Sequence, residues 1–157
     1  MSTDGHRSDH TCVVQSVTAR VAGRVMTDVF AHHFGTPEQQ VGVRTGDVLT
    51  YVHDHDIARD IAQVFTRAQY FAAIHLRERV APSWLGIEPD TYPPSLLLRF
   101  ALAPVVRADP VAQRTAGTTI TPAHVAIRVG PVLWQVCDQQ AAVALADAWT
   151  SCTRMLT

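Results

Sequence analysis

The feature that most limits how this chain can fold is a stretch of sequence that occurs twice. Residues 36–69 align with residues 121–153 after one single-residue gap. Ten of the 26 positions from Val41 to Thr66 are identical to those from Val125 to Thr150, whereas unrelated stretches of this composition share roughly two. The sequence therefore predicts two tandem copies of one structural unit.

Each copy is predicted to begin with a β-hairpin. Apolar residues alternate with Arg44 in the first copy and with Arg128 in the second, which is the period-two pattern of a half-buried strand. Gly46 and Gly130 follow where the chain must reverse, and an apolar run then forms the return strand.

A helix is predicted after each hairpin. The first is expected from about Asp56 to Arg79 and the second from about Gln139 to Leu156, because apolar residues recur there at helical spacing. Asp54 and Asp138 come directly before these patterns. A carboxylate in that place accepts hydrogen bonds from the first free N–H groups of a helix, so both are predicted N-caps.

More strand-like sequence lies upstream of each hairpin. Residues 17–29 alternate as one long strand or as a hairpin bent near Gly23, and residues 96–102 alternate before Pro104. The predicted fold class is α+β. Two tandem strand-strand(-strand)-helix repeats form a mixed or antiparallel sheet of six to eight strands, with two helices on one face and a pseudo-twofold relation between the repeats.

The domain organisation follows from the same pattern. Residues 1–11 are polar and are expected to form a disordered tail, and residues 12–157 a single domain. That domain is divided into repeat 1 (about 12–80), a connector (81–95) that is rich in proline and contains Trp84 and Tyr92, and repeat 2 (about 96–157).

Composition narrows the class of protein. Apolar residues make up 47% and charged residues 17% of the chain, which excludes an intrinsically disordered protein and suggests that another subunit covers part of the surface. All 13 basic residues are arginine, since the chain has neither lysine nor asparagine. A G/C-rich, bacterial type of genome explains this bias, because both missing residues use A/T-rich codons.

The cysteines and the hydropathy point to the cytoplasm. Cys12, Cys137 and Cys152 are odd in number and lack metal-type spacing, as expected of reduced thiols. No signal-peptide pattern opens the chain, and no apolar run is long enough to span a bilayer. We therefore expect a cytoplasmic location and no membrane partner.

One cluster could perform chemistry. His53, His55 and Asp56 lie at the first strand-to-helix junction, where two imidazoles and a carboxylate could bind a divalent metal in a metal-dependent enzyme. The second copy retains only the aspartate of this segment, as Asp138, which favours a capping role for Asp54. His32, His33 and His124 could join this cluster in space. The sequence contains no nucleophile elbow and no phosphate-binding glycine loop, so we expect no enzyme and no cofactor.

Arginines on the predicted strands suggest a second kind of site. Together with an aromatic residue on each return strand, they could follow a phosphate backbone and stack unpaired bases; the residues are Arg20, Arg24, Arg44, Arg99, Arg128, Tyr51 and Trp134. Two tandem units of several strands and a helix resemble, in architecture alone, the Whirly and PUR-type proteins, and this resemblance implies binding of single strands. The alternative is that exposed strand positions carry arginine because this genome avoids lysine.

Three functions remain open at this point. The leading interpretation is a non-enzymatic binding or scaffold module, expected to be a homo-oligomer, that acts through the sheet face or the groove between the repeats. Its partner would be a second copy or another protein. The alternatives are single-stranded nucleic-acid binding through an arginine-lined sheet face and a metal-dependent enzyme at His53, His55 and Asp56.

Overall fold

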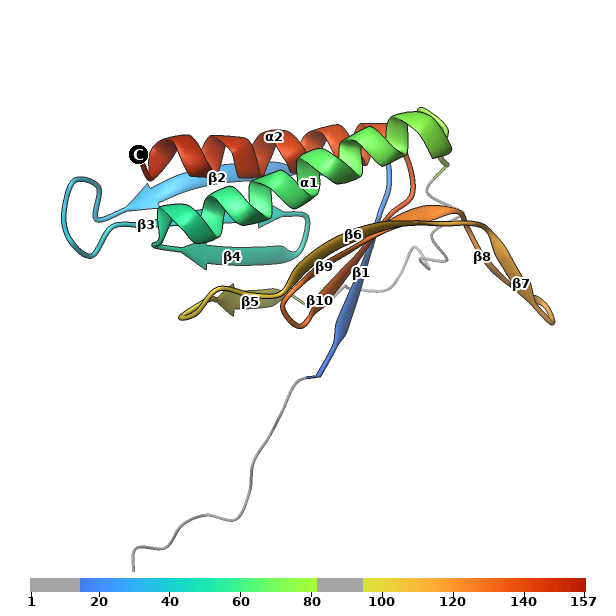
Figure 1. The fold of residues 1–157 in the computed structure, drawn as a ribbon, viewed down its shortest axis with the longest axis horizontal. Coiled ribbons are helices and arrows are strands. Elements are labelled where there is room, and N and C mark those ends of the chain that lie inside the picture. The colour runs from blue at the N-terminus through green and yellow to red at the C-terminus, as the bar shows by residue number, and fades with distance from the viewer. Residues whose placement is uncertain (1–14, 82–94) are drawn as a thin grey trace, which may run out of the picture.

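The computed structural model of the protein describes residues 15–81 and 95–157 (Figure 1). The predicted tail, Cys12 and most of the predicted connector, with Trp84 and Tyr92, lie outside these residues. No helix in the described part is long and apolar enough to cross a membrane.

The α+β class is confirmed, because two helices lie over mixed sheets. The helices are α1 (His55–His75) and α2 (Gln139–Met155). We expected one sheet of six to eight strands, but the ten described strands form two four-stranded sheets and a separate two-stranded hairpin. Sheet A has the order β1 (Val17–Val21), β10 (Val132–Val136), β9 (His124–Val129) and β6 (Val106–Val111). Sheet B has the order β2 (Thr27–His32), β3 (Gln40–Thr45), β4 (Val48–Val52) and β5 (Leu96–Arg99), and β7 (Arg114–Ala116) pairs with β8 (Thr119–Thr121).

The two halves of the chain exchange one strand each. β1 runs parallel to β10 in sheet A, whereas β5 runs parallel to β4 in sheet B. Residues 17–29 are thus neither a single strand nor a hairpin, because the chain turns at Gly23, whose φ is 70°, and passes from one sheet to the other. The four-stranded sheets are each completed by a strand from the other half.

Corresponding hydrogen bonds hold the two hairpin turns. The turn glycine Gly46 donates its N–H to the Met26 carbonyl at 2.8 Å, and Gly130 donates to the Val105 carbonyl at 2.9 Å. Both glycines have φ near 60°, a conformation that favours glycine. The residue after each turn glycine binds an exchanged strand. Pro131 O accepts a hydrogen bond from Val17 N–H at 2.8 Å, and Asp47 O accepts one from Leu96 N–H at 2.9 Å.

The helices lie side by side above the sheets (Figure 1). Helix α1 packs on β6 and β9, whereas α2 packs on β2 and β3, so each helix covers strands from the other half. The core between these layers is centred on Phe65, whose ring stacks on Trp149 and meets Trp134 edge to face, with centroids 6.1 Å apart in both pairs. Strand exchange and helix packing together make one shared core.

Both predicted N-caps are confirmed, but they differ in surroundings. Asp54 is exposed and accepts one hydrogen bond, from Ile57 N–H at 3.0 Å. Asp138 is fully buried and accepts from Ala141 at 2.8 Å, Gly23 at 2.6 Å and Val80 at 3.0 Å. One carboxylate therefore joins the start of α2 to the β1–β2 crossover and to the segment after α1.

Helix α1 ends earlier than the expected Arg79. Its C-cap is Leu76, and the following carbonyls turn toward the second helix. Gln139 and Gln140 donate their N–H groups to Arg77 O and Glu78 O. The last predicted turn of α1 is thus replaced by contacts with the start of α2.

Candidate functional site

The outer face of sheet B carries the most distinctive cluster of side chains. In β3 and β4, the alternate residues that include Val43, Thr50 and Val52 are buried beneath the helices. The intervening residues therefore point away from the helices. We call this surface the aromatic face and define it as Phe30, His32, Arg44, Leu49, Tyr51, Leu97 and Arg99.

Strand register places the key residues of this face in one row. Phe30 is opposite Gly42, Gly42 is opposite Tyr51, and Tyr51 is opposite Arg99. The ring of Phe30 is perpendicular to those of Tyr51 and His32, at centroid distances of 6.2 and 5.2 Å. The guanidinium of Arg99 lies 5.2 Å from the centre of the Tyr51 ring. This row thus combines ring surfaces with a positive charge.

Gly42 makes room for the row. A Cβ atom at this position would lie 2.6 Å from the Phe30 ring and 3.1 Å from that of Tyr51. Real Cβ atoms do not approach so closely, and the ring of Phe30 therefore lies directly against the backbone of β3. Any larger residue would displace the aromatic side chains.

The arginines of the aromatic face are exposed and unpaired. Arg44 and Arg99 have no hydrogen-bond or ion-pair partner among the described residues. Asp28 is opposite Arg44 in the strand register, yet no ion pair forms between them in this part of the chain. Their N–H groups are thus available to an anionic ligand.

A hollow of about 400 Å³ lies at one end of the aromatic face. Tyr51 and Arg99 form part of its lining, together with His53, Gln40 and residues of the β2–β3 loop. Extending the β3–β4 register by one residue places Gln40 opposite His53, and Gln40 is also opposite His32. The hollow is therefore a continuation of the aromatic face.

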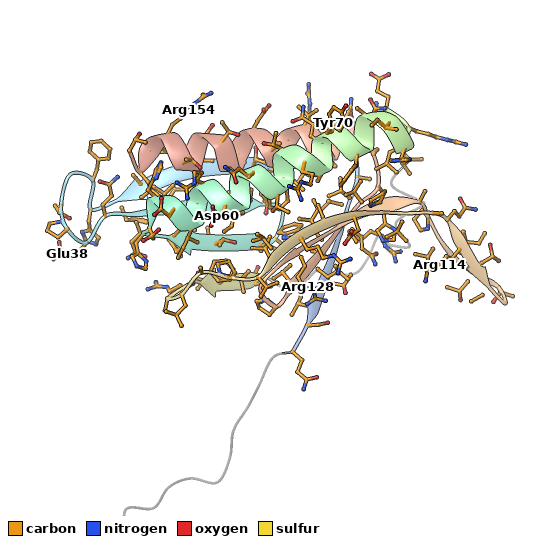
Figure 2. All side chains as sticks on the ribbon, in the orientation of Figure 1. Glu38, Asp60, Tyr70, Arg114, Arg128 and Arg154 are labelled. Atoms are coloured by element: carbon orange, nitrogen blue, oxygen red, sulfur yellow. The ribbon has the colours of Figure 1, made fainter. Side chains whose placement is uncertain are left out.

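In the described part of the chain, the outer face of sheet A has arginines at corresponding positions but no aromatic ring. Its matching row is Asp109, Ala126, Gln135 and Arg20. Arg20 donates from Nε to Gln135 Oε1 at 2.9 Å, and Arg107 forms an ion pair with Asp109. Figure 2 shows Arg128 on this sheet, on the side away from the helices, and Arg154 and Tyr70 on the helix side. Sheet A thus offers charge without a stacking surface.

Two of the residues predicted from the sequence to bind nucleic acid do not lie on an outer sheet face. Trp134 is only 3% exposed and packs against Phe65, so its prediction as a stacking residue is wrong. The reason is strand alternation, since Trp134 is opposite the buried Ile127 and faces the helices. Arg24 lies in the β1–β2 crossover beside Glu78 and Gln140, away from both sheet faces.

Sequence reasoning missed Phe30 and Arg107. Both could have been found by continuing the period-two pattern, because Phe30 lies two residues from Asp28 and from His32 and so shares their face, and Arg107 precedes the buried Ala108. Arg20, Arg44, Arg99 and Arg128 do lie on the outer faces, but they are divided between two sheets.

The three proposed metal ligands do not converge on one point. His55, the first residue of α1, has its Nδ1 3.6 Å from Asp56 Oδ1, and Asp56 also forms an ion pair with Arg59 at 2.9 Å, whereas His53 lines the hollow. His124 is buried in sheet A and its Nδ1 lies 2.8 Å from the Pro122 carbonyl. Throughout residues 15–81 and 95–157, no group of three His, Cys, Asp or Glu residues is placed to hold a metal ion.

The two described cysteines are free and buried. Burial raises the pKa of the Cys137 thiol from 9.0 to about 11 and that of Cys152 to about 12. Both therefore stay protonated at neutral pH, and a neutral thiol is a poor nucleophile.

Comparisons with protein-family models, curated proteins and solved structures find no match for this chain.

Proposed function

We propose that this protein is a non-enzymatic binding protein that takes single-stranded nucleic acid on the aromatic face of sheet B. The observation that carries the proposal is the row of Phe30, Tyr51 and Arg99, in which two rings lie beside a guanidinium that has no hydrogen-bond or ion-pair partner among the described residues. Aromatic rings on an open surface stack unpaired bases, and each stacked base contributes about 1–3 kcal/mol.

The distribution of charge favours an anionic partner. The chain as a whole has a formal charge of −1. Within residues 15–81 and 95–157, the outer faces of the two sheets nevertheless carry five arginines (Arg20, Arg44, Arg99, Arg107 and Arg128) and two carboxylates, Asp28 and Asp109. A positive surface on a near-neutral protein attracts phosphate groups locally.

A single strand fits this surface better than a duplex. The base faces of a duplex are stacked on one another and are hidden from an aromatic side chain, whereas an unpaired strand can turn its bases toward the rings. Leu49 and Leu97, beside the aromatic row, add apolar surface for the sugar and base edges.

Fluorescence anisotropy with labelled oligonucleotides tests the proposal. Single strands are expected to bind more tightly than duplexes of the same sequence, with an affinity that falls as salt is raised. Tyr51→Ala should weaken binding about tenfold, in line with the loss of one stacked base. Tyr70→Ala is the matched control, because Tyr70 is an exposed tyrosine on α1 and should leave affinity unchanged.

Two results would overturn the proposal. One is the absence of binding to any oligonucleotide at low salt. The other is binding that Tyr51→Ala and Tyr70→Ala weaken equally, because the aromatic face would then have no special part in it.

Self-association is a second candidate, favoured by apolar side chains on the helix side. Tyr70 and Ile74 of α1 are 70% and 61% exposed, and Val143 of α2 is 41% exposed. Apolar surface of this kind is often covered by a partner, and we propose a second copy of the chain. Light scattering of the protein and of Ile74→Glu tests it, since a dimer should become a monomer in the variant.

Two broader proposals accompany the function. The halves are copies related by a pseudo-twofold axis, which the corresponding hydrogen bonds at Gly46 and Gly130 support. The protein acts in the cytoplasm, as the free thiols of Cys137 and Cys152 favour.

A further inference from the structure

The hollow beside Tyr51 has the size and the lining of a small-ligand site. Its volume of about 400 Å³ lies within the usual range for such sites. Tyr51 supplies a ring, Arg99 a guanidinium, and His53 and Gln40 further polar groups. The lining thus combines hydrogen-bond donors with an aromatic surface.

Arg99 is held in a position suited to a phosphate. The central carbon of its guanidinium lies over the Tyr51 ring, 5.2 Å from the ring centroid, which is the arrangement of a cation–π contact. Its N–H groups have no hydrogen-bond or ion-pair partner among the described residues. Such a fork matches two oxygens of one phosphate group.

The next row of the sheet adds polar groups and no carboxylate. His32, Gln40 and His53 follow one another across β2, β3 and the end of β4. The acidic residue that lines the hollow in the described part of the chain is Glu38, which is exposed on the β2–β3 loop. The interior of the hollow therefore presents donors to an anion.

Two segments border this end of the aromatic face. One is the β2–β3 loop, which is fastened by Gln39, whose Nε2 donates to Met155 O at 2.9 Å and whose Oε1 accepts from Gly35 N–H at 3.1 Å. The other consists of Phe100 and Ala101, directly after β5. We expect a strand that lies along the sheet to end between these two segments.

We propose that the hollow binds the terminal phosphate of a nucleic-acid strand. The proposal rests on the proposed function, because the aromatic face holds the rest of the strand. A terminal phosphate carries more negative charge than an internal phosphodiester. The Arg99 guanidinium and His53, which both line the hollow, can therefore bind a terminal phosphate more strongly.

Three forms of one fluorescent oligonucleotide test the proposal: with a 5′-phosphate, with a 3′-phosphate and without a terminal phosphate, the label being placed at an internal base. One phosphorylated form is expected to bind about tenfold more tightly than the form without a phosphate. Arg99→Gln should abolish that preference. Arg44→Gln, at the other end of the face, should weaken all three forms alike and preserve the ratio.

The outcomes separate this proposal from the function on which it rests. Equal binding of the three forms overturns the terminal-phosphate site and leaves single-strand binding intact. If none of the three binds, both proposals fail. Competition by a free nucleoside monophosphate at the concentration at which the phosphorylated oligonucleotide competes overturns the strand-end assignment, because it assigns the hollow to mononucleotides.

Discussion

Sheets A and B share strand order, hairpin turns and inward-facing residues, yet their outer faces differ. The row Phe30, Gly42, Tyr51 and Arg99 in sheet B corresponds to Asp109, Ala126, Gln135 and Arg20 in sheet A. Only the arginine is common to both rows. In sheet B it lies over a ring, whereas in sheet A it is hydrogen-bonded to an amide.

This difference shows which positions the fold constrains. Inward-facing residues such as Val43 and Ile127 are alike because each must pack beneath a helix. Outer-face residues have no such requirement and are free to diverge. This freedom is compatible with our proposal that the aromatic row of sheet B binds a ligand.

The largest expected effect concerns the caps of the two halves. Asp138→Ala leaves three backbone N–H groups without their acceptor and should lower the free energy of unfolding by about 3 kcal/mol or more. Asp54→Ala removes an exposed cap and should cost about 1 kcal/mol. Urea denaturation of both variants measures the difference, and equal losses would contradict the special role of Asp138.

The next largest effect concerns affinity for single strands, compared between arginine variants of sheet B and of sheet A. Replacing Arg44 and Arg99 by glutamine should weaken single-strand binding about a hundredfold, at roughly tenfold for each phosphate contact. The same change at Arg107 and Arg128 of sheet A should weaken it no more than about threefold, through loss of general charge. Anisotropy titrations at one salt concentration decide it. Equal losses would show that both sheets bind.

A smaller effect is expected from building the aromatic row on sheet A. The triple variant Asp109→Phe, Ala126→Gly and Gln135→Tyr reproduces the residues of sheet B in register. It should create a second site and raise the number of short oligonucleotides bound per chain from one to about two, as stacking at the new rings contributes. Stoichiometric titration measures this number.

A matched control retains Ala126 in that variant. The Cβ of residue 126 should obstruct the new ring, since a Cβ at Gly42 would lie 2.6 Å from Phe30. An equal gain with and without the glycine would show that the close approach at Gly42 is unimportant.

The smallest effect belongs to the buried thiols, which are a feature of the second half. Its Cys137 and Cys152 align with His53 and Ala68 of the first half. Their pKa values in the folded protein, about 11 and about 12, exceed the ordinary value of 9.0. The folded state therefore keeps these protons to higher pH than the unfolded state does.

The two buried thiols should make the free energy of unfolding fall at alkaline pH. Their stabilising contribution is fully present below about pH 9 and is lost as the pH rises toward 11 and 12. Urea unfolding at pH 8 and pH 10.5 should show this decline, and Cys152→Ala should make it shallower. An unchanged slope in that variant would contradict burial as its cause.

The sequence was sufficient for the hairpins, both helices and both caps, because these depend on neighbours along the chain. Which sheet β1 and β5 join could not be foreseen, since pairing over such separations has no local pattern. Trp134 was misjudged because Leu133 and Trp134 are both large and apolar, so that alternation alone does not tell which one faces the core. Tyr51 and Arg99 were foreseen on a sheet face, but their contact depends on the exchanged strand β5.

The exchange of strands also determines when during synthesis the chain can fold. Arg20 and Gln135, neighbours across β1 and β10, are 115 residues apart in the chain. In a nascent chain that has emerged only to the end of α1, the β6 and β9 strands on which this helix packs are not yet present. The edge of β4 that pairs with β5 is also unpaired at that point. The protein should therefore fold late in synthesis, and chains cut short near residue 80 should depend on chaperones.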